Sequence, residues 1–126
     1  MVTAGEISDE ELARYRAAAR RRHQAELAAL VRRERHAWEL ARQAAALLRE
    51  RFHADRVLVF GSLIHPSCFT EWSDVDVAAD GIDPADTLRA MEEVQDLSRA
   101  IPVHLADLAA CRQSLRAVVE REGVPV

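Results

Sequence analysis

The feature that most constrains the fold is a stretch of 45 residues, 8–52, that contains neither proline nor glycine. Alanine is abundant in it, and the apolar residues recur mostly in steps of three and four, which is the period of one helix face. Ser8 followed by Glu11 matches a capping box and predicts where the helix begins. We therefore predict one helix about 67 Å long, roughly twice the span of a small domain.

The two halves of this helix differ in composition. The second half carries an apolar stripe that should pack on the rest of the fold, formed by Trp38, Ala41, Ala45, Leu48 and Phe52. The first half is more polar and contains Arg20-Arg21-Arg22 and Arg32-Arg33. Its arginines alternate with glutamates and aromatic residues are few, which argues against a nucleic-acid contact. A solvated face, and packing against a partner chain or a second copy, both stay open for it.

Two segments with the character of strands follow the helix. Residues 57–60 form an apolar run typical of a strand buried on both faces, and Gly61-Ser62 ends it. Because glycine lets the backbone approach a ligand closely, the amides of this pair and the Ser62 hydroxyl are predicted to hold a phosphate oxygen. In the second segment Asp74 and Asp76 alternate with valines, so both carboxylates lie on one face.

The aspartate pair predicts a metal site. Two carboxylates about 7 Å apart along a strand repel each other when ionised, and a hard divalent cation with oxygen ligands relieves that repulsion. We expect Asp74 and Asp76 to bind Mg²⁺ or Mn²⁺. A solvent-facing D-x-D on an edge strand is common, but its place after Gly61-Ser62, with 11 residues between, favours the functional interpretation.

These residues resemble the nucleotidyltransferases of the DNA polymerase β superfamily, in particular the minimal nucleotidyltransferase (MNT) domains found as antitoxins beside HEPN-domain toxins. The match rests on Gly61, Ser62, Asp74 and Asp76 and covers residues 53–126. The gap between the serine and the first aspartate is slightly longer than usual in the family, so the loop between them is predicted to bulge. The resemblance implies ATP as substrate, Mg²⁺ or Mn²⁺ as cofactor, and a cognate HEPN-type toxin as partner.

The family normally completes this site with a third carboxylate on a later strand, and here the sequence departs from the pattern. In the strand predicted over residues 101–106, the alternation of apolar residues places His104 on the opposite face. We therefore expect His104 at the third position, as a catalytic residue with Asp74 and Asp76. Imidazole can ligate Mn²⁺ or accept a proton near neutral pH, whereas Mg²⁺ uses it poorly.

Two further residues have competing interpretations. Asp107 is another candidate for the third carboxylate, but an aspartate just before the helix predicted over residues 108–122 is more typical of an N-cap. Trp72, on the loop before the aspartates, is predicted to pack against the base of that loop. Stacking of Trp72 on an adenine is the alternative.

The predicted fold class is α/β, a polymerase-β-type nucleotidyltransferase fold preceded by a long N-terminal helix. Residues 1–52 would form the helix, with its second half packed on the core, and residues 53–126 the minimal nucleotidyltransferase domain. The domain would contain strands over 55–60, 74–80 and 101–106, a short helix or turn after Ser62, and helices over 84–99 and 108–122. The three strands would form a small mixed sheet with helices on one side.

Length and charge narrow the class of protein further. The 126 residues, 49% of them hydrophobic, suffice for a single core without a second substrate-binding domain. No apolar run approaches the roughly 18 residues of a membrane span and no signal segment begins the chain, which predicts a cytoplasmic protein without membrane contact. The charge balance is +3 over residues 1–56 and −7 over residues 57–126, so a bound cation would relieve repulsion in the acidic part.

Two functions are expected as alternatives. The first is an enzyme that transfers AMP from ATP to a protein hydroxyl and thereby silences a HEPN toxin; the small domain has little surface to enclose a small acceptor. The second is a catalytically degenerate module that neutralises the toxin by forming a complex, which the histidine at position 104 keeps open. The long helix is the expected surface for such a partner or for a homo-oligomer.

Overall fold

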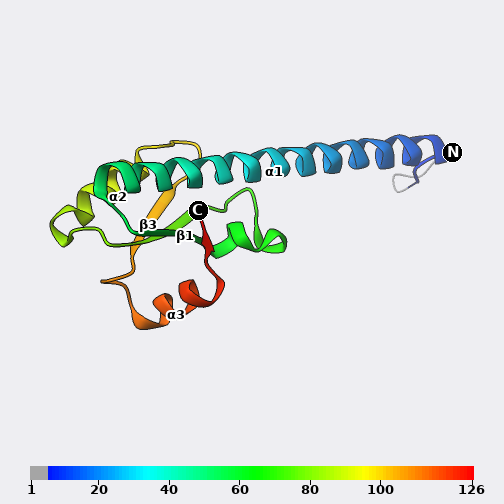
Figure 1. Ribbon diagram of the computed structural model, residues 1–126. Helices are drawn as coiled ribbons and strands as arrows, with labels where there is room; N and C mark the ends of the chain where they lie inside the picture. Colours follow the sequence, from blue (N-terminus) through cyan, green and yellow to red (C-terminus); the bar gives the residue numbers. More distant parts are fainter. Residues whose placement is uncertain (1–5) are drawn as a thin grey trace. The chain divides into compact units, whose positions relative to one another are not determined.

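A computed structural model describes residues 6–126, and the long helix is its largest element. Helix α1 spans Asp9–Phe52 without interruption, as predicted (Figure 1). The predicted capping box is present: the Glu11 N–H donates to Ser8 Oγ at 3.1 Å, and the Ser8 N–H donates to Glu11 Oε2 at 3.2 Å. The chain consists of two compact units, Met1–Arg32 and Arg33–Val126.

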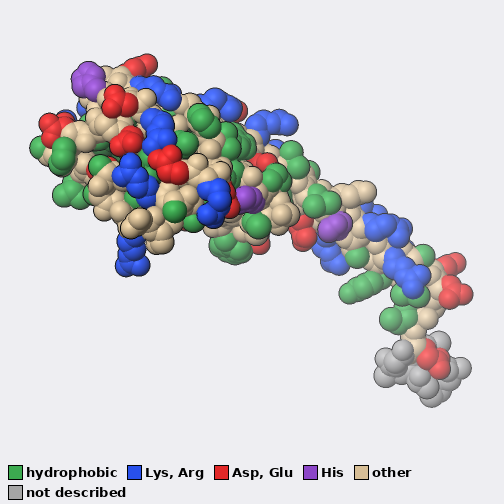
Figure 2. All heavy atoms as spheres, turned by 60° about the horizontal axis from the view of Figure 1, so that its bottom comes forward, with side chains coloured by type: hydrophobic (Ala, Val, Ile, Leu, Met, Phe, Trp, Pro, Cys, Tyr) green, Lys and Arg blue, Asp and Glu red, His purple; other side chains and the backbone are tan. Residues whose placement is uncertain are grey.

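In the first unit, the described residues 6–32 carry no buried side chain. Tyr15 is 69% exposed and Leu27 is 49% exposed. Arginine side chains lie between hydrophobic ones along this segment, and acidic residues occupy the first turn of the helix (Figure 2). Acidic residues there complement the helix dipole, so the helicity of this unit rests on alanine content, capping and charge rather than on a core.

The second unit is built on a four-stranded sheet with the order β3-β2-β1-β4. The strands are β1 (Arg56–Phe60), β2 (Val75–Asp80), β3 (Val103–Asp107) and β4 (Val124–Pro125). β1 runs antiparallel to β2 and β4, and β2 runs parallel to β3, so the sheet is mixed as predicted. The prediction of three strands was wrong, because β4 is a fourth strand. The sequence pattern does not reveal β4, since it has only two residues, one of them proline, and therefore no hydrophobic alternation.

Helices cover both faces of the sheet, and the prediction of helices on one side was wrong. Residues 33–52 of α1 and helix α2 (Thr87–Gln95) lie on one face, and helix α3 (Gln113–Glu122) lies on the other (Figure 1). The buried residues of α1 are Ala37, Leu40, Ala41, Ala44, Ala45, Leu48 and Phe52.

Strand β1 explains why both faces need a cover. Leu58 packs in one cluster with Val119 of α3. Val57 and Val59 are fully buried as well, and alternation along the strand directs them to the opposite layer. A strand that is apolar at successive positions therefore requires a helix on each side.

The two later helices are shorter than predicted. Residues Pro84–Asp86 form a 3-10 turn before α2, and α2 ends at Gln95 instead of residue 99. α3 begins at Gln113 instead of residue 108, because a turn follows β3 first. Within residues 6–126, no helix combines the length and the apolar character that crossing a membrane requires.

Candidate active site

The site is built around Asp76 in the middle of the sheet. In the strand register Asp76 pairs with Phe60 of β1 on one side and with His104 of β3 on the other. Paired residues of neighbouring strands direct their side chains to the same face. That face is the one that carries Ala78 beneath α3, so the site lies on the α3 side of the sheet.

Asp74 completes a cluster with His104. The sequence predicted Asp74 within the strand. β2 begins at Val75, however, so Asp74 lies just before the strand. Asp74 Oδ2 is 3.2 Å from His104 Nε2, and the two side chains are 37% and 50% exposed. The structure thus brings the three predicted catalytic residues, Asp74, Asp76 and His104, to one place on the sheet.

Gly61 lies directly against the Asp76 carboxylate. Its φ is +78°, and a Cβ added to it would lie 2.6 Å from Asp76 Oδ2. Glycine alone tolerates both the positive φ and so close an approach. Ser62 follows it in the 3-10 helix η1 (Gly61–Ile64) and is half-buried. The Gly-Ser pair and the second aspartate, apart in the sequence, therefore form one continuous surface.

The electrostatic environment of Asp76 is unfavourable for its charged form. Burial raises the pKa of Asp76, the charge of Asp74 raises it further, and His104 acts in the opposite direction. No side-chain hydrogen bond supports the Asp76 carboxylate among residues 6–126. A half-buried carboxylate without a fixed cationic partner is suited to a cation that arrives from solution.

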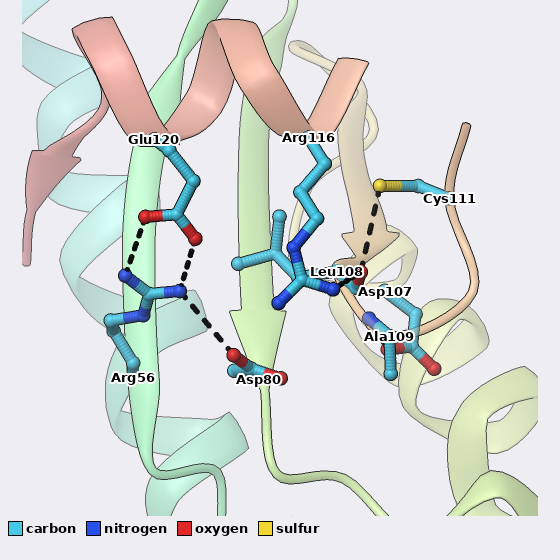
Figure 3. Close-up of polar contacts among 8 residues, drawn as sticks. All are labelled: Arg56, Asp80, Asp107, Leu108, Ala109, Cys111, Arg116 and Glu120. Carbon is cyan, nitrogen blue, oxygen red and sulfur yellow. Dashed lines mark hydrogen bonds and ion pairs between the residues drawn. The ribbon is translucent and has the colours of Figure 1, made fainter. Parts of the chain in front are cut away.

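Asp80, on the same strand as Asp76, differs from it because Asp80 has a fixed cationic partner, Arg56. Arg56 donates a hydrogen bond to Asp80 Oδ2 at 3.3 Å and another to Glu120 Oε2 at 2.9 Å (Figure 3). This hydrogen bonding lowers the pKa of Glu120. Arg56, Asp80 and Glu120 form a structural network that ties α3 to the sheet, and Asp80 is not available for a metal.

From the raised pKa of Asp76 we predict that the free energy of unfolding depends on pH. Because the folded-state pKa is raised above the unfolded value of about 3.9, ionised Asp76 destabilises the metal-free fold above the raised pKa. The penalty disappears as pH falls below the unfolded value. We expect Asp76→Asn to raise the Tm of metal-free protein at pH 7, and the difference from wild type to vanish below about pH 4 in thermal melts. An equal Tm across this pH range would contradict the electrostatic account.

Asp107 does not belong to the site. It alternates with His104 along β3, which directs it to the opposite face, and it is only 7% exposed. Its carboxylate accepts hydrogen bonds from Thr87 Oγ1 at 3.1 Å and from the Ala109 N–H at 3.0 Å. Figure 3 shows Asp107 at the end of β3 and Ala109 in the turn that follows. Asp107 caps the turn after β3 rather than helix α3, so both predicted roles for it, third carboxylate and helix N-cap, were wrong.

Trp72 is 82% exposed, so the prediction that it packs against its loop was wrong. The loop is shaped by two 3-10 helices, η1 and η2 (Pro66–Cys68), and by a turn at residues 70–73. These turns take up the extra length between Ser62 and Asp74. The loop packs instead through Phe69, which is buried.

The donor set fits a metal that binds together with a nucleotide. Among residues 6–126, no group of three or more His, Cys, Asp or Glu side chains is arranged to hold a metal by itself. Mg²⁺ is commonly held by one or two carboxylates, with waters and substrate phosphates as the other ligands. The Asp76 carboxylate fills the place where a side chain of residue 61 would stand, so the backbone of Gly61 lies directly against this carboxylate. Asp74 and Asp76 therefore suit a cation that phosphate oxygens help to coordinate.

A mixed sheet with a Gly-Ser turn after one strand and two aspartates at the start of its antiparallel neighbour is the fold predicted for a nucleotidyltransferase. A solved structure of the toxin–antitoxin MntA–HpeT, in a mutant with two aspartate-to-glutamate substitutions two positions apart, has a similar overall fold, with a TM-score of 0.55. The sequences are 18% identical over 68% of this chain and 70% of that chain. The likeness confirms the predicted fold class. No protein-family profile matches the sequence, and no curated protein does.

Proposed function

We propose that this protein is an MNT-type nucleotidyltransferase that transfers AMP from ATP to a hydroxyl of a cognate HEPN-type toxin and so acts as its antitoxin. The observation that carries the proposal is the contact of Gly61 with Asp76, with Asp74 and His104 beside it. The likeness to MntA–HpeT supports the class of partner. The substitutions in that structure also fall on aspartates with the spacing of Asp74 and Asp76.

In the proposed mechanism, some residues of the site bind the metal and the nucleotide, and His104 takes part in the chemical step. Asp74 and Asp76 would hold Mg²⁺ or Mn²⁺, while Gly61 and Ser62 would hold a phosphate through their amides and the Ser62 hydroxyl. When bound, the metal supplies positive charge that stabilises the phosphoryl group during in-line displacement. Adenylyl transfer joins the acceptor oxygen to the α-phosphorus and breaks the bond to pyrophosphate.

His104 takes the proton of the acceptor hydroxyl in this scheme. Its side chain is 50% exposed, so an acceptor on another protein can reach it. Asp74, 3.2 Å away, stabilises the imidazolium that forms. The histidine thereby replaces the third carboxylate as a base, while the two aspartates keep the metal.

A second function is favoured by the same residue. A neutral imidazole in place of a carboxylate weakens a Mg²⁺ site, and a site without activity would leave a module that neutralises the toxin by binding alone. The first function requires AMP transfer to the toxin, and the second requires only that the two proteins bind. Incubation of the protein with a candidate HEPN toxin, Mg²⁺ or Mn²⁺, and ATP labelled at the α-phosphate separates them. Label on the toxin supports transfer, whereas neutralisation without label supports complex formation.

Substitutions at His104 test the role of the imidazole. If His104 serves as a base or as a metal ligand, Mn²⁺ should support AMP transfer better than Mg²⁺. His104→Asp should then restore a preference for Mg²⁺, measured as the ratio of initial rates with the two metals. Transfer with Mg²⁺ that survives in His104→Ala would contradict this role and point to a group supplied by the partner.

The first unit is proposed to contact the toxin or a second copy of the chain. Its exposed apolar side chains, among them Tyr15 and Leu27, lie outside the compact unit that holds the site. Deletion of residues 1–24 should therefore leave Mg-ATP affinity unchanged while weakening self-association or toxin binding. Analytical ultracentrifugation and calorimetry measure both quantities. Unchanged sedimentation and unchanged toxin affinity would identify this segment as a merely solvated helix.

A further inference from the structure

Trp72 has the highest exposed fraction of the large hydrophobic side chains in residues 6–126, at 82%. Burying an apolar side chain stabilises a fold by about 25 cal/mol per Å² of area, so an indole left in water contributes little to the fold. An exposed tryptophan combines a large apolar body with a flat aromatic surface, which suits it to contact with a ligand.

The turn that carries Trp72 is fixed rather than loose. Ser73 N–H donates to the Thr70 carbonyl at 3.1 Å, and Thr70 N–H donates to Ser73 Oγ at 2.9 Å. The backbone N–H of Trp72 itself donates to Thr70 Oγ1 at 3.2 Å. Arg33 of α1 donates to the Ser73 carbonyl at 2.9 Å, and Phe69, 3% exposed, anchors the start of the turn. The indole is thus presented to solvent from a preorganised support.

The turn keeps Trp72 close along the chain to the residues predicted to bind the triphosphate. Trp72 precedes Asp74 by two residues, a length of chain that spans at most about 7 Å. A triphosphate held by Asp74, Asp76 and the Gly-Ser pair would have its base one ribose away from the α-phosphate. The indole is therefore within range of a base.

We propose that Trp72 is the base-stacking residue of this site and that it favours purine nucleotides. This inference rests on the proposed function, since the phosphate positions come from Asp74 and Asp76. Stacking on an aromatic face accepts every base and requires no hydrogen-bond partner. Purines offer the larger area to the indole, so the expected order of affinity is ATP and GTP above CTP and UTP.

Calorimetry in the presence of Mg²⁺ tests the proposal with two ligands, ATP and inorganic tripolyphosphate. Trp72→Ala should weaken ATP binding at least about fivefold, and it should leave tripolyphosphate affinity unchanged. Trp72→Phe should lose less, and Trp72→Ala should bind purine and pyrimidine nucleotides alike. The matched control is Trp38→Phe in α1, which should bind both ligands as wild type does.

Fluorescence gives an independent measurement, because the chain has 2 tryptophans and Trp38→Phe leaves Trp72 as the only one. Mg-ATP should quench the emission of that variant, and Mg-tripolyphosphate should not. Unquenched emission, with ATP affinity that depends on Asp76 and not on Trp72, would overturn the stacking and leave the proposed function standing.

Three other results would also overturn the inference. Equal losses of ATP and tripolyphosphate affinity in Trp72→Ala would mean that the residue only supports the loop. An absence of Mg-dependent ATP binding in wild type would overturn the stacking and the proposed function together. Weaker toxin binding by Trp72→Ala, with ATP affinity unchanged, would assign the indole to the protein partner instead.

Discussion

Asp76→Asn should reduce the proposed AMP transfer by about a hundredfold to a thousandfold, the scale seen when one preorganised electrostatic group is removed from an active site. Asparagine keeps the shape of the side chain and removes the charge that the cation needs. The loss should appear in the initial rate of transfer and in Mg-dependent ATP affinity. The fold should persist, because burial already raises the pKa of this carboxyl and makes its charge unfavourable in the metal-free protein.

Asp96→Asn is the matched control, since it makes the same chemical change at an exposed residue that follows α2. Transfer and ATP affinity should stay at wild-type values in it. If calorimetry gave Asp76→Asn the same ATP affinity as wild type, both with and without Mg²⁺, Asp76 would not be a metal ligand.

Gly61→Ala should produce the second large effect, in stability and binding together. The backbone there has φ +78°, which costs a non-glycine residue about 1–3 kcal/mol, and the new Cβ would press on Asp76 Oδ2 at 2.6 Å. We expect a lower Tm and loss of Mg-ATP binding in the folded variant, measured by thermal melts and calorimetry.

Gly81→Ala is the control that separates the effect of backbone strain from the effect of a change in the site. Gly81 also has a positive φ, +86°, and its Cβ would meet a different carboxylate, that of Asp55. This variant should lose stability in the same way as Gly61→Ala and keep wild-type affinity for Mg-ATP when folded. A Gly61→Ala protein that is destabilised but binds Mg-ATP normally would show that the glycine serves only the turn.

The elements that the sequence predicted well are those whose signals are local. The capping box of Ser8 and Glu11 needs four consecutive residues, and the alternation around Asp76 needs five. Alternation also placed His104 on the right face, because a strand has a strict period of two. Each of these signals lies within a single element, so no knowledge of the tertiary fold was required.

The features that escaped prediction depend on contacts between elements. The approach of Gly61 to Asp76 joins two strands across a loop, and no pattern within either strand encodes it. Asp107 was assigned to a helix because its partner Thr87 is distant in the sequence. Trp72 was expected to pack because most loop tryptophans do, whereas here Phe69 fills the space beneath the turn.

The antiparallel pairing of β1 with β2 has a consequence for how such a protein can diverge. The ladder sets Phe60 opposite Asp76, and therefore Gly61 beside the carboxylate, whatever happens in the hairpin between the strands. The pairing of Phe60 with Asp76 does not depend on the number of residues between positions 63 and 73. Under the proposed function, selection can thus remodel this loop, including the residue at position 72, to suit a new nucleotide or a new toxin while Gly61 stays beside the Asp76 carboxylate.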